Sequence, residues 1–215
     1  MRIEEEIISS IKTEIVDFSS DYIETLIDSG VSDGIVKDIP IIGTVLSIYR
    51  TSKSVRDYIF AKNIMLFLSS IDNISAEKRK AMINKLETNE RLGMKCGSFL
   101  ISVLSKLDTS EKAKLSGFIF KKYINGEIDG YNNLKLISLV EKMFWPDIKE
   151  FALADDIKQV SRYIIDNLIS LGLMTIQEVG TVVGYKGGPI GAVLNDFGKV
   201  AKSTLREYFN NDHCT

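Results

Sequence analysis

Apolar residues recur every three or four positions along most of this chain, which is the spacing of amphipathic helices. The first stripe comprises Ile3, Ile7, Ile11, Ile15, Phe18, Tyr22 and Leu26. Acidic side chains occupy the opposite face, and the pattern predicts a single helix that Gly30 and Gly34 end. Similar stripes continue along the chain, and only three prolines interrupt its 215 residues. The sequence therefore predicts a mainly α-helical protein.

Polar residues mark where several of these helices begin. Pro40 suits a first helical turn, where its missing N–H costs nothing. Ser75 is typical of an N-cap, and Asp108 with Glu111 matches a capping box. Pro146 interrupts a later stripe, because the residue before a proline avoids the helical region.

This interruption also suggests a division of the chain. We expect the boundary near Trp145–Leu153. An N-terminal helical bundle would then cover about residues 1–150, and a smaller unit would cover residues 151–215.

The C-terminal third combines one more helical stripe with a glycine-rich patch. Within the patch, Gly187 and Gly188 suit a tight turn between two extended runs, Ile176–Val183 and Pro189–Leu194. This patch lacks the lysine-then-serine or lysine-then-threonine pair of a phosphate-binding loop, since Gly187 follows Lys186. The stripe before the patch comprises Ile157, Val160, Ile164, Leu168 and Leu171.

The order of these segments resembles the second half of a winged-helix domain. A helix closes with LISLGLM, a glycine hairpin forms the wing, and LNDFGKVAKSTL opens a further helix. Asn195 stands where threonine is usual, and we expect it to cap this helix. The resemblance covers residues 157–209 and implies an α+β unit with a β-hairpin wing. It also implies either DNA binding or contact with another protein.

Charge is distributed unevenly along the chain. Residues 1–34 carry nine acidic and two basic side chains, whereas residues 35–122 carry sixteen basic and eight acidic ones. An acidic helix docked on a basic body accounts for this asymmetry, and a basic surface that faces phosphate is the alternative. The predicted winged-helix unit has few cations, so we expect it to contact protein rather than DNA.

Two groups of residues are candidate binding surfaces. The first group would form a basic helix face together with the wing, and it comprises Lys78, Arg79, Lys80, Lys85, Tyr185 and Lys186. The second group comprises Ile41, Ile42 and Leu46, in the apolar first half of the helix that begins at Pro40. We expect this half to be buried in the fold, and the alternative is shallow insertion into an anionic membrane surface.

Catalytic and metal-binding patterns are weak throughout the sequence. The single histidine, His213, lies near the C-terminus, and Asn125–Asp129 resembles a calcium-binding loop but has lysine at the position of the first carboxylate. The two cysteines, Cys96 and Cys214, do not form a disulfide framework. We therefore expect no enzyme, no cofactor and no bound metal.

These observations lead to an expected function. The longest charge-free runs have 11 residues, far fewer than the roughly 20 that a membrane-spanning helix needs. With no secretory signal, we expect a cytoplasmic protein of bacterial or phage origin that binds a protein partner or its own copies. The alternatives are a winged-helix nucleic-acid binder and a membrane-perturbing effector in host–phage conflict.

Overall fold

The computed structural model describes residues 2–13, 20–29, 39–89, 95–178 and 190–211. This part of the chain is mainly α-helical, with one small antiparallel hairpin near the C-terminus, as the periodicity predicts. The chain divides into two compact units, Met1–Glu141 and Lys142–Thr215. The division precedes the expected one, so the helix that begins at Trp145 belongs to the second unit.

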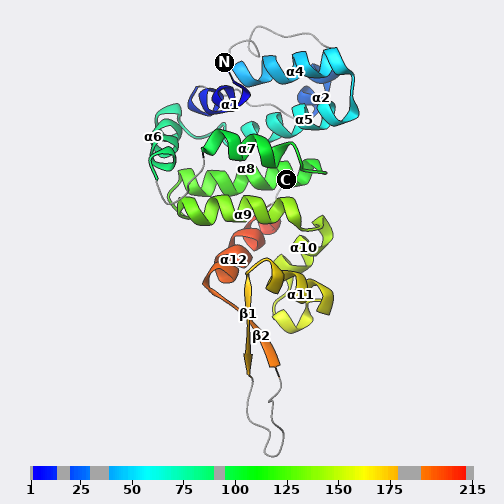
Figure 1. Cartoon of the computed structure of the whole chain (residues 1–215), viewed down its shortest axis with the longest axis vertical. Coiled ribbons are helices and arrows are strands. Elements are labelled where there is room, and N and C mark those ends of the chain that lie inside the picture. The colour runs from blue at the N-terminus through cyan, green and yellow to red at the C-terminus, as the bar shows by residue number, and fades with distance from the viewer. Residues whose placement is uncertain (1, 14–19, 30–38, 90–94, 179–189, 212–215) are drawn as a thin grey trace, which may run out of the picture. The chain divides into compact units, whose positions relative to one another are not determined.

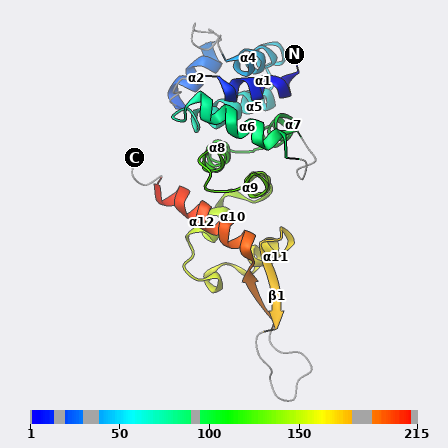
Figure 2. The ribbon, with the colours of Figure 1, turned by 90° about the vertical axis from the view of Figure 1, so that its left-hand side faces the viewer.

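The first unit is a bundle of helices (Figure 1). Their bounds are α1 Ile3–Lys12, α2 Ser20–Ser29, α4 Pro40–Ser52, α5 Val55–Ser69, α6 Ala76–Glu87, α7 Cys96–Leu104, α8 Ser110–Ile124 and α9 Gly130–Lys142. Helices α5 and α8 pack together through the rings of Phe67 and Phe120, whose centroids are 5.3 Å apart. Helix α9 runs beside α8 (Figures 1 and 2). Burial of α5 on nearly all sides explains why Ile64–Leu68 is apolar without interruption.

The prediction of one long N-terminal helix is wrong. Helix α1 ends at Lys12, and Thr13 has extended backbone dihedrals. The apolar stripe resumes on α2, where Ile23, Leu26 and Ile27 are buried. The physical reason lies in a tertiary contact, because a buried arginine from α6 binds the carbonyl of Thr13 and thereby stabilises the end of α1.

The predicted helix starts are mostly confirmed. Pro40 lies in the first turn of α4, and Ser75 Oγ accepts a hydrogen bond from Lys78 N. The capping residue of α8 differs from the prediction, because Thr109 accepts from the first-turn backbone while Asp108 pairs with a lysine side chain.

The second unit contains α10 Trp145–Leu153, a short 3-10 turn Ile157–Gln159, α11 Arg162–Ser170, strands β1 Met174–Glu178 and β2 Ile190–Leu194, and α12 Asp196–Asn211. The two strands pair antiparallel, with Met174 opposite Leu194 and Glu178 opposite Ile190. The predicted turn at Gly187–Gly188 lies outside the described residues. Helix α12 packs against α10, and Trp145 contacts Phe209 at a centroid distance of 5.3 Å.

Asn195 joins three segments of this unit. Its Oδ1 accepts from Gly198 N at 2.9 Å, which confirms the predicted cap of α12, and its Nδ2 donates to Gly172 O at 2.9 Å. Gly172 has a φ of +74°, a left-handed conformation that ends α11 and that glycine adopts without strain. Gly198 lies so close to the backbone oxygen of Leu173 that a Cβ there would overlap it. These contacts fix the start of α12 beside the end of α11.

Candidate interaction surfaces

The predicted basic face of α6 is only partly present. Lys78, Lys80 and Lys85 are exposed, and Lys78 Nζ donates to Asn125 Oδ1 at 2.8 Å. Arg79, however, is 1% exposed, so its assignment to a binding surface is wrong. The reason is geometric, because successive helical residues point about 100° apart and Arg79 lies on the side that faces the core.

The guanidinium of Arg79 binds backbone carbonyls of two segments. Its Nε donates to Ile11 O at 2.7 Å, and one Nη donates to Thr13 O at the end of α1. The other Nη contacts the carbonyls of Ile71, Asp72 and Ile74 between α5 and α6. The most central cation of the predicted surface is therefore an internal cap for helix ends.

Other cations of the basic middle segment are paired within the first unit. Lys112 is almost fully buried and forms an ion pair with Asp108 at 2.9 Å. Lys122 pairs with Glu127, and its hydrogen bond holds the pKa of that carboxyl below the ordinary value. Arg79, Lys112 and Lys122 are therefore held within the fold and do not add to a basic surface.

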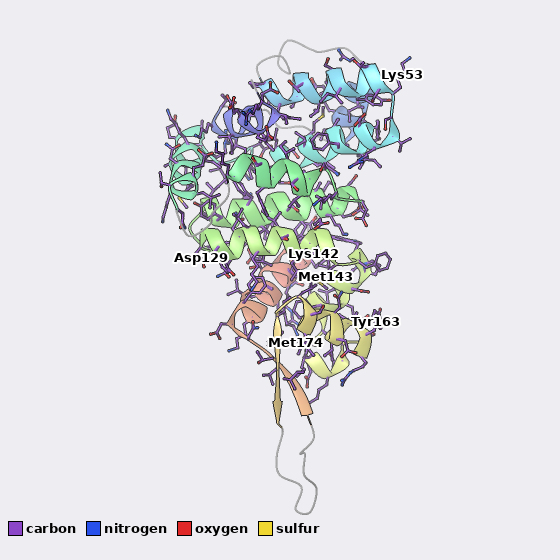
Figure 3. All side chains as sticks on the ribbon, viewed as in Figure 1. Lys53, Asp129, Lys142, Met143, Tyr163 and Met174 are labelled. Carbon is purple, nitrogen blue, oxygen red and sulfur yellow. The ribbon has the colours of Figure 1, made fainter. Side chains whose placement is uncertain are left out.

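A hollow of about 760 Å³ lies beside the exposed part of α6. Met82, Lys85 and Leu86 line one side, and the turn between α8 and α9 lines the other. That turn is ordered locally, since Asp129 Oδ1 accepts from Asn132 N at 3.0 Å (Asp129 is labelled in Figure 3). The loop that resembled a calcium site is thus a helix-capping turn.

The predicted membrane contacts are buried inside the first unit. Ile41 and Ile42 are 0% exposed and Leu46 is 1% exposed, which confirms the expected burial of this half of α4 and shows that the alternative, membrane contact by these residues, is wrong. They pack inward because α4 contacts both α1 and α5. The exposed aliphatic residues lie further on, at the α4–α5 turn, where Val55 is 75% exposed.

Charged side chains on α11 and on α12 of the second unit form ion pairs within their own helix. Arg162 pairs with Asp166 at 3.3 Å on α11, and Lys199 pairs with Asp196 at 3.1 Å on α12. Lys202 lies over the ring of Phe151, and burial lowers the pKa of this lysine. A surface that binds duplex DNA needs unpaired cations that face the phosphates. These ion pairs reduce the positive charge that α11 and α12 could offer to DNA.

Arg206 is also used inside the second unit. Its Nε donates to Ala152 O at 2.9 Å, and one Nη donates to Leu153 O at 3.2 Å and to Ala154 O. The same group contacts Asp155. Arg206 therefore satisfies carbonyls at the C-terminal end of α10, as Arg79 does for α1.

The hairpin exposes apolar side chains. Ile176 on β1 is 60% exposed, and Val193 on β2 is 36% exposed. Tyr163, labelled on α11 in Figure 3, is 62% exposed. The other two candidate surface residues, Tyr185 and Lys186, lie outside the described residues.

The described residues offer little reactive chemistry. Cys96 is buried, and burial raises the pKa of its thiol to about 12, which keeps it protonated. Burial likewise raises the pKa of Tyr123 to about 12, and its hydroxyl donates to Met82 O at 2.8 Å. In the described ranges, no three His, Cys, Asp or Glu side chains gather as metal ligands would. His213 and Cys214 fall outside those ranges.

Comparison with protein-family models, curated proteins and solved structures finds no match to this chain. Within the described part of the chain, every helix is too short or too polar to cross a bilayer.

Proposed function

We propose that this chain is a non-catalytic protein-binding module and that the β1–β2 hairpin of its second unit contacts the partner. The observation that carries the proposal is the exposure of Ile176 on β1 and of Val193 on β2. Ile176 lies opposite Ala192 and Val193 lies opposite Thr175, so the two exposed side chains belong to opposite faces of the hairpin. Exposed aliphatic residues on a hairpin gain most from burial against another apolar surface. The partner is a second protein or another copy of the chain.

The charges beside the hairpin support a protein partner over a duplex. Arg162 of α11 is paired with Asp166, and Arg206 of α12 is bound to backbone carbonyls. A winged-helix unit that bound DNA would direct such cations at phosphates. We therefore favour the protein-binding form of the winged-helix resemblance.

The proposal is tested by binding measurements on the full chain and on the I176D/V193D variant. We expect self-association in sedimentation velocity, or a partner retained from cells that naturally express the chain, and loss of either in the variant. The matched control is Ser170→Asp, an exposed acidic substitution on α11 that leaves the hairpin unchanged. Retention on duplex DNA that weakens steeply with salt, with no effect of I176D/V193D, would contradict the proposal.

A further inference from the structure

The α4–α5 turn of the first unit presents cations and aliphatic side chains together. Arg50, Lys53 and Arg56 are exposed there. Val55 is exposed beside them, as are Ile48 on α4 and Ile59 on α5. Val55 and Ile59 are four residues apart on one helix and so lie on the same side.

The cations of this turn form no ion pair within the described residues, unlike most of the cations described above. Among the described residues, no ion pair involves Arg50, Lys53 or Arg56. Asp57, at the start of α5, accepts from Ser52 Oγ and keeps its negative charge, whereas Glu24 pairs with Lys62 at 2.6 Å. Arg50, Lys53 and Arg56 outnumber Asp57 at this turn. The turn is therefore locally basic, and its complement is an anionic surface.

The polar groups of the turn are satisfied from within. Thr51 Oγ1 donates to Ser47 O at 2.9 Å, and Ser54 Oγ accepts from Arg56 N at 3.2 Å. Lys53 N donates to Tyr49 O at 2.7 Å. These hydrogen bonds lower the cost of moving the turn's uncharged polar groups into the headgroup region, while its charged side chains stay at the polar level of that region.

Lys53 itself has an unusual backbone conformation. It ends α4 with a φ of +49°, in the left-handed region, where glycine or asparagine is the ordinary choice (Lys53 is labelled in Figure 3). A lysine here accepts backbone strain and places a cation at the end of the helical hairpin. Tyr49 on α4 and Tyr58 on α5 pack edge to face, with ring centroids 5.6 Å apart, and this contact holds the two helices together.

We propose that the α4–α5 turn docks on an anionic lipid surface, with Val55 entering the headgroup region and Arg50, Lys53 and Arg56 binding lipid phosphates. Interleaved aliphatic and basic side chains match a bilayer interface, which offers both an apolar layer and negative charge. A nucleic acid would use the cations but would gain little from Val55. This docking is independent of the hairpin in the second unit.

Co-sedimentation of the full chain with vesicles tests the proposal. We expect binding to equimolar phosphatidylglycerol and phosphatidylcholine, and little binding to phosphatidylcholine alone. Each cation near an anionic surface is worth roughly fivefold in partitioning, so R50Q/R56Q should reduce the partition coefficient roughly 30-fold. The matched control K80Q/K85Q removes the same charge from α6 and should change it by less than about twofold.

Two single variants separate lipid docking from other interactions. V55D should reduce vesicle binding roughly tenfold or more while the thermal unfolding midpoint stays unchanged, because Val55 is exposed. Lys53→Gly should relieve the backbone strain and raise that midpoint, yet weaken vesicle binding roughly fivefold.

Three outcomes would overturn the proposal. The first is equal loss of binding in R50Q/R56Q and K80Q/K85Q, which would indicate general charge attraction. The second is vesicle binding that V55D does not alter. The third is tighter binding to duplex DNA than to the anionic vesicles, with the same loss in R50Q/R56Q, which would assign the turn to nucleic acid.

Discussion

Arg79 in the first unit and Arg206 in the second perform the same task in different surroundings. Each binds several backbone carbonyls where a helix ends, but Arg79 is 1% exposed, whereas the side chain of Arg206 is 36% exposed. Water can replace the contacts of Arg206 more readily than those of Arg79, whose bonds to Ile11 O, Ile71 O and Ile74 O are buried. A basic residue in a charged segment can therefore stabilise the fold instead of forming a binding surface. Its contribution to the free energy of unfolding increases with its burial.

The largest expected effect comes from Arg79→Ala. It would leave buried carbonyls of Ile11, Ile71 and Ile74 without this donor, so we expect a loss of about 3 to 5 kcal/mol in the free energy of unfolding. Urea unfolding of the full chain measures it. The neighbouring exposed residue provides the control, since Lys80→Ala should change stability by less than about 0.5 kcal/mol. Similar small losses in both variants would show that Arg79 does not support the fold.

A substitution at Gly198 tests whether close backbone packing, in addition to Arg206, stabilises the position of α12. A Cβ at Gly198 would overlap the backbone oxygen of Leu173, so Gly198→Ala should cost about 2 to 3 kcal/mol. Gly43→Ala is the matched control, because space is open around Gly43 on α4 and the helix should gain about 0.5 to 1 kcal/mol. Thermal unfolding distinguishes the two, and a stabilising effect at Gly198 would refute the close approach.

Arg206→Ala should have a smaller effect than either of those losses. The carbonyls of Ala152 and Leu153 regain partners from solvent, so we expect a loss of about 1 to 2 kcal/mol. The same urea titration allows direct comparison with Arg79→Ala. If Arg206→Ala lowered the free energy of unfolding more than Arg79→Ala, burial would not determine how much each arginine contributes to stability.

The smallest effect concerns a carboxylate in the second unit. Glu150 Oε1 accepts from Ser161 Oγ at 2.6 Å and from Ser161 N at 2.7 Å, and these bonds lower the pKa of Glu150. Because the folded pKa lies below the unfolded value near 4.5, the contribution is present above that pH and is lost as pH falls through the folded pKa. Ser161→Ala should raise the pKa towards 4.5, as carboxyl carbon shifts in NMR would report. An unchanged titration would mean that the hydroxyl has no role there.

Local sequence signals predicted much of the fold. Apolar spacing gave the helical class, and Pro40, Ser75 and Asn195 act at helix starts as expected. These predictions succeed because capping and periodicity depend on residues within one or two turns. The two predicted extended runs are confirmed in part, because β1 Met174–Glu178 contains the first three residues of the run Ile176–Val183 and β2 Ile190–Leu194 matches the second run. Residues 179–183 of the first run lie outside the described residues.

The candidate surfaces were predicted less well, because exposure depends on distant segments. Arg79 has the sequence context of a basic run. Its burial depends on packing against the end of α1, far away in the sequence, whose carbonyls bind its side chain together with those between α5 and α6. Ile41 is apolar at a helix start whether it faces lipid or core, and its N–H binds Ser10 Oγ at 3.1 Å. Val55 gave one usable signal, since it lies between the exposed cations Lys53 and Arg56 at a turn.

Site-specific photo-crosslinking at the hairpin tests the central claim most directly. A benzophenone side chain at position 176 in the full chain should form a covalent adduct with a protein, either a partner or a second copy, in cells that naturally express the chain. The same group at position 170 of α11 should form none. Equal labelling from the two positions, or adducts from position 176 with nucleic acid alone, would contradict the claim that this hairpin binds protein.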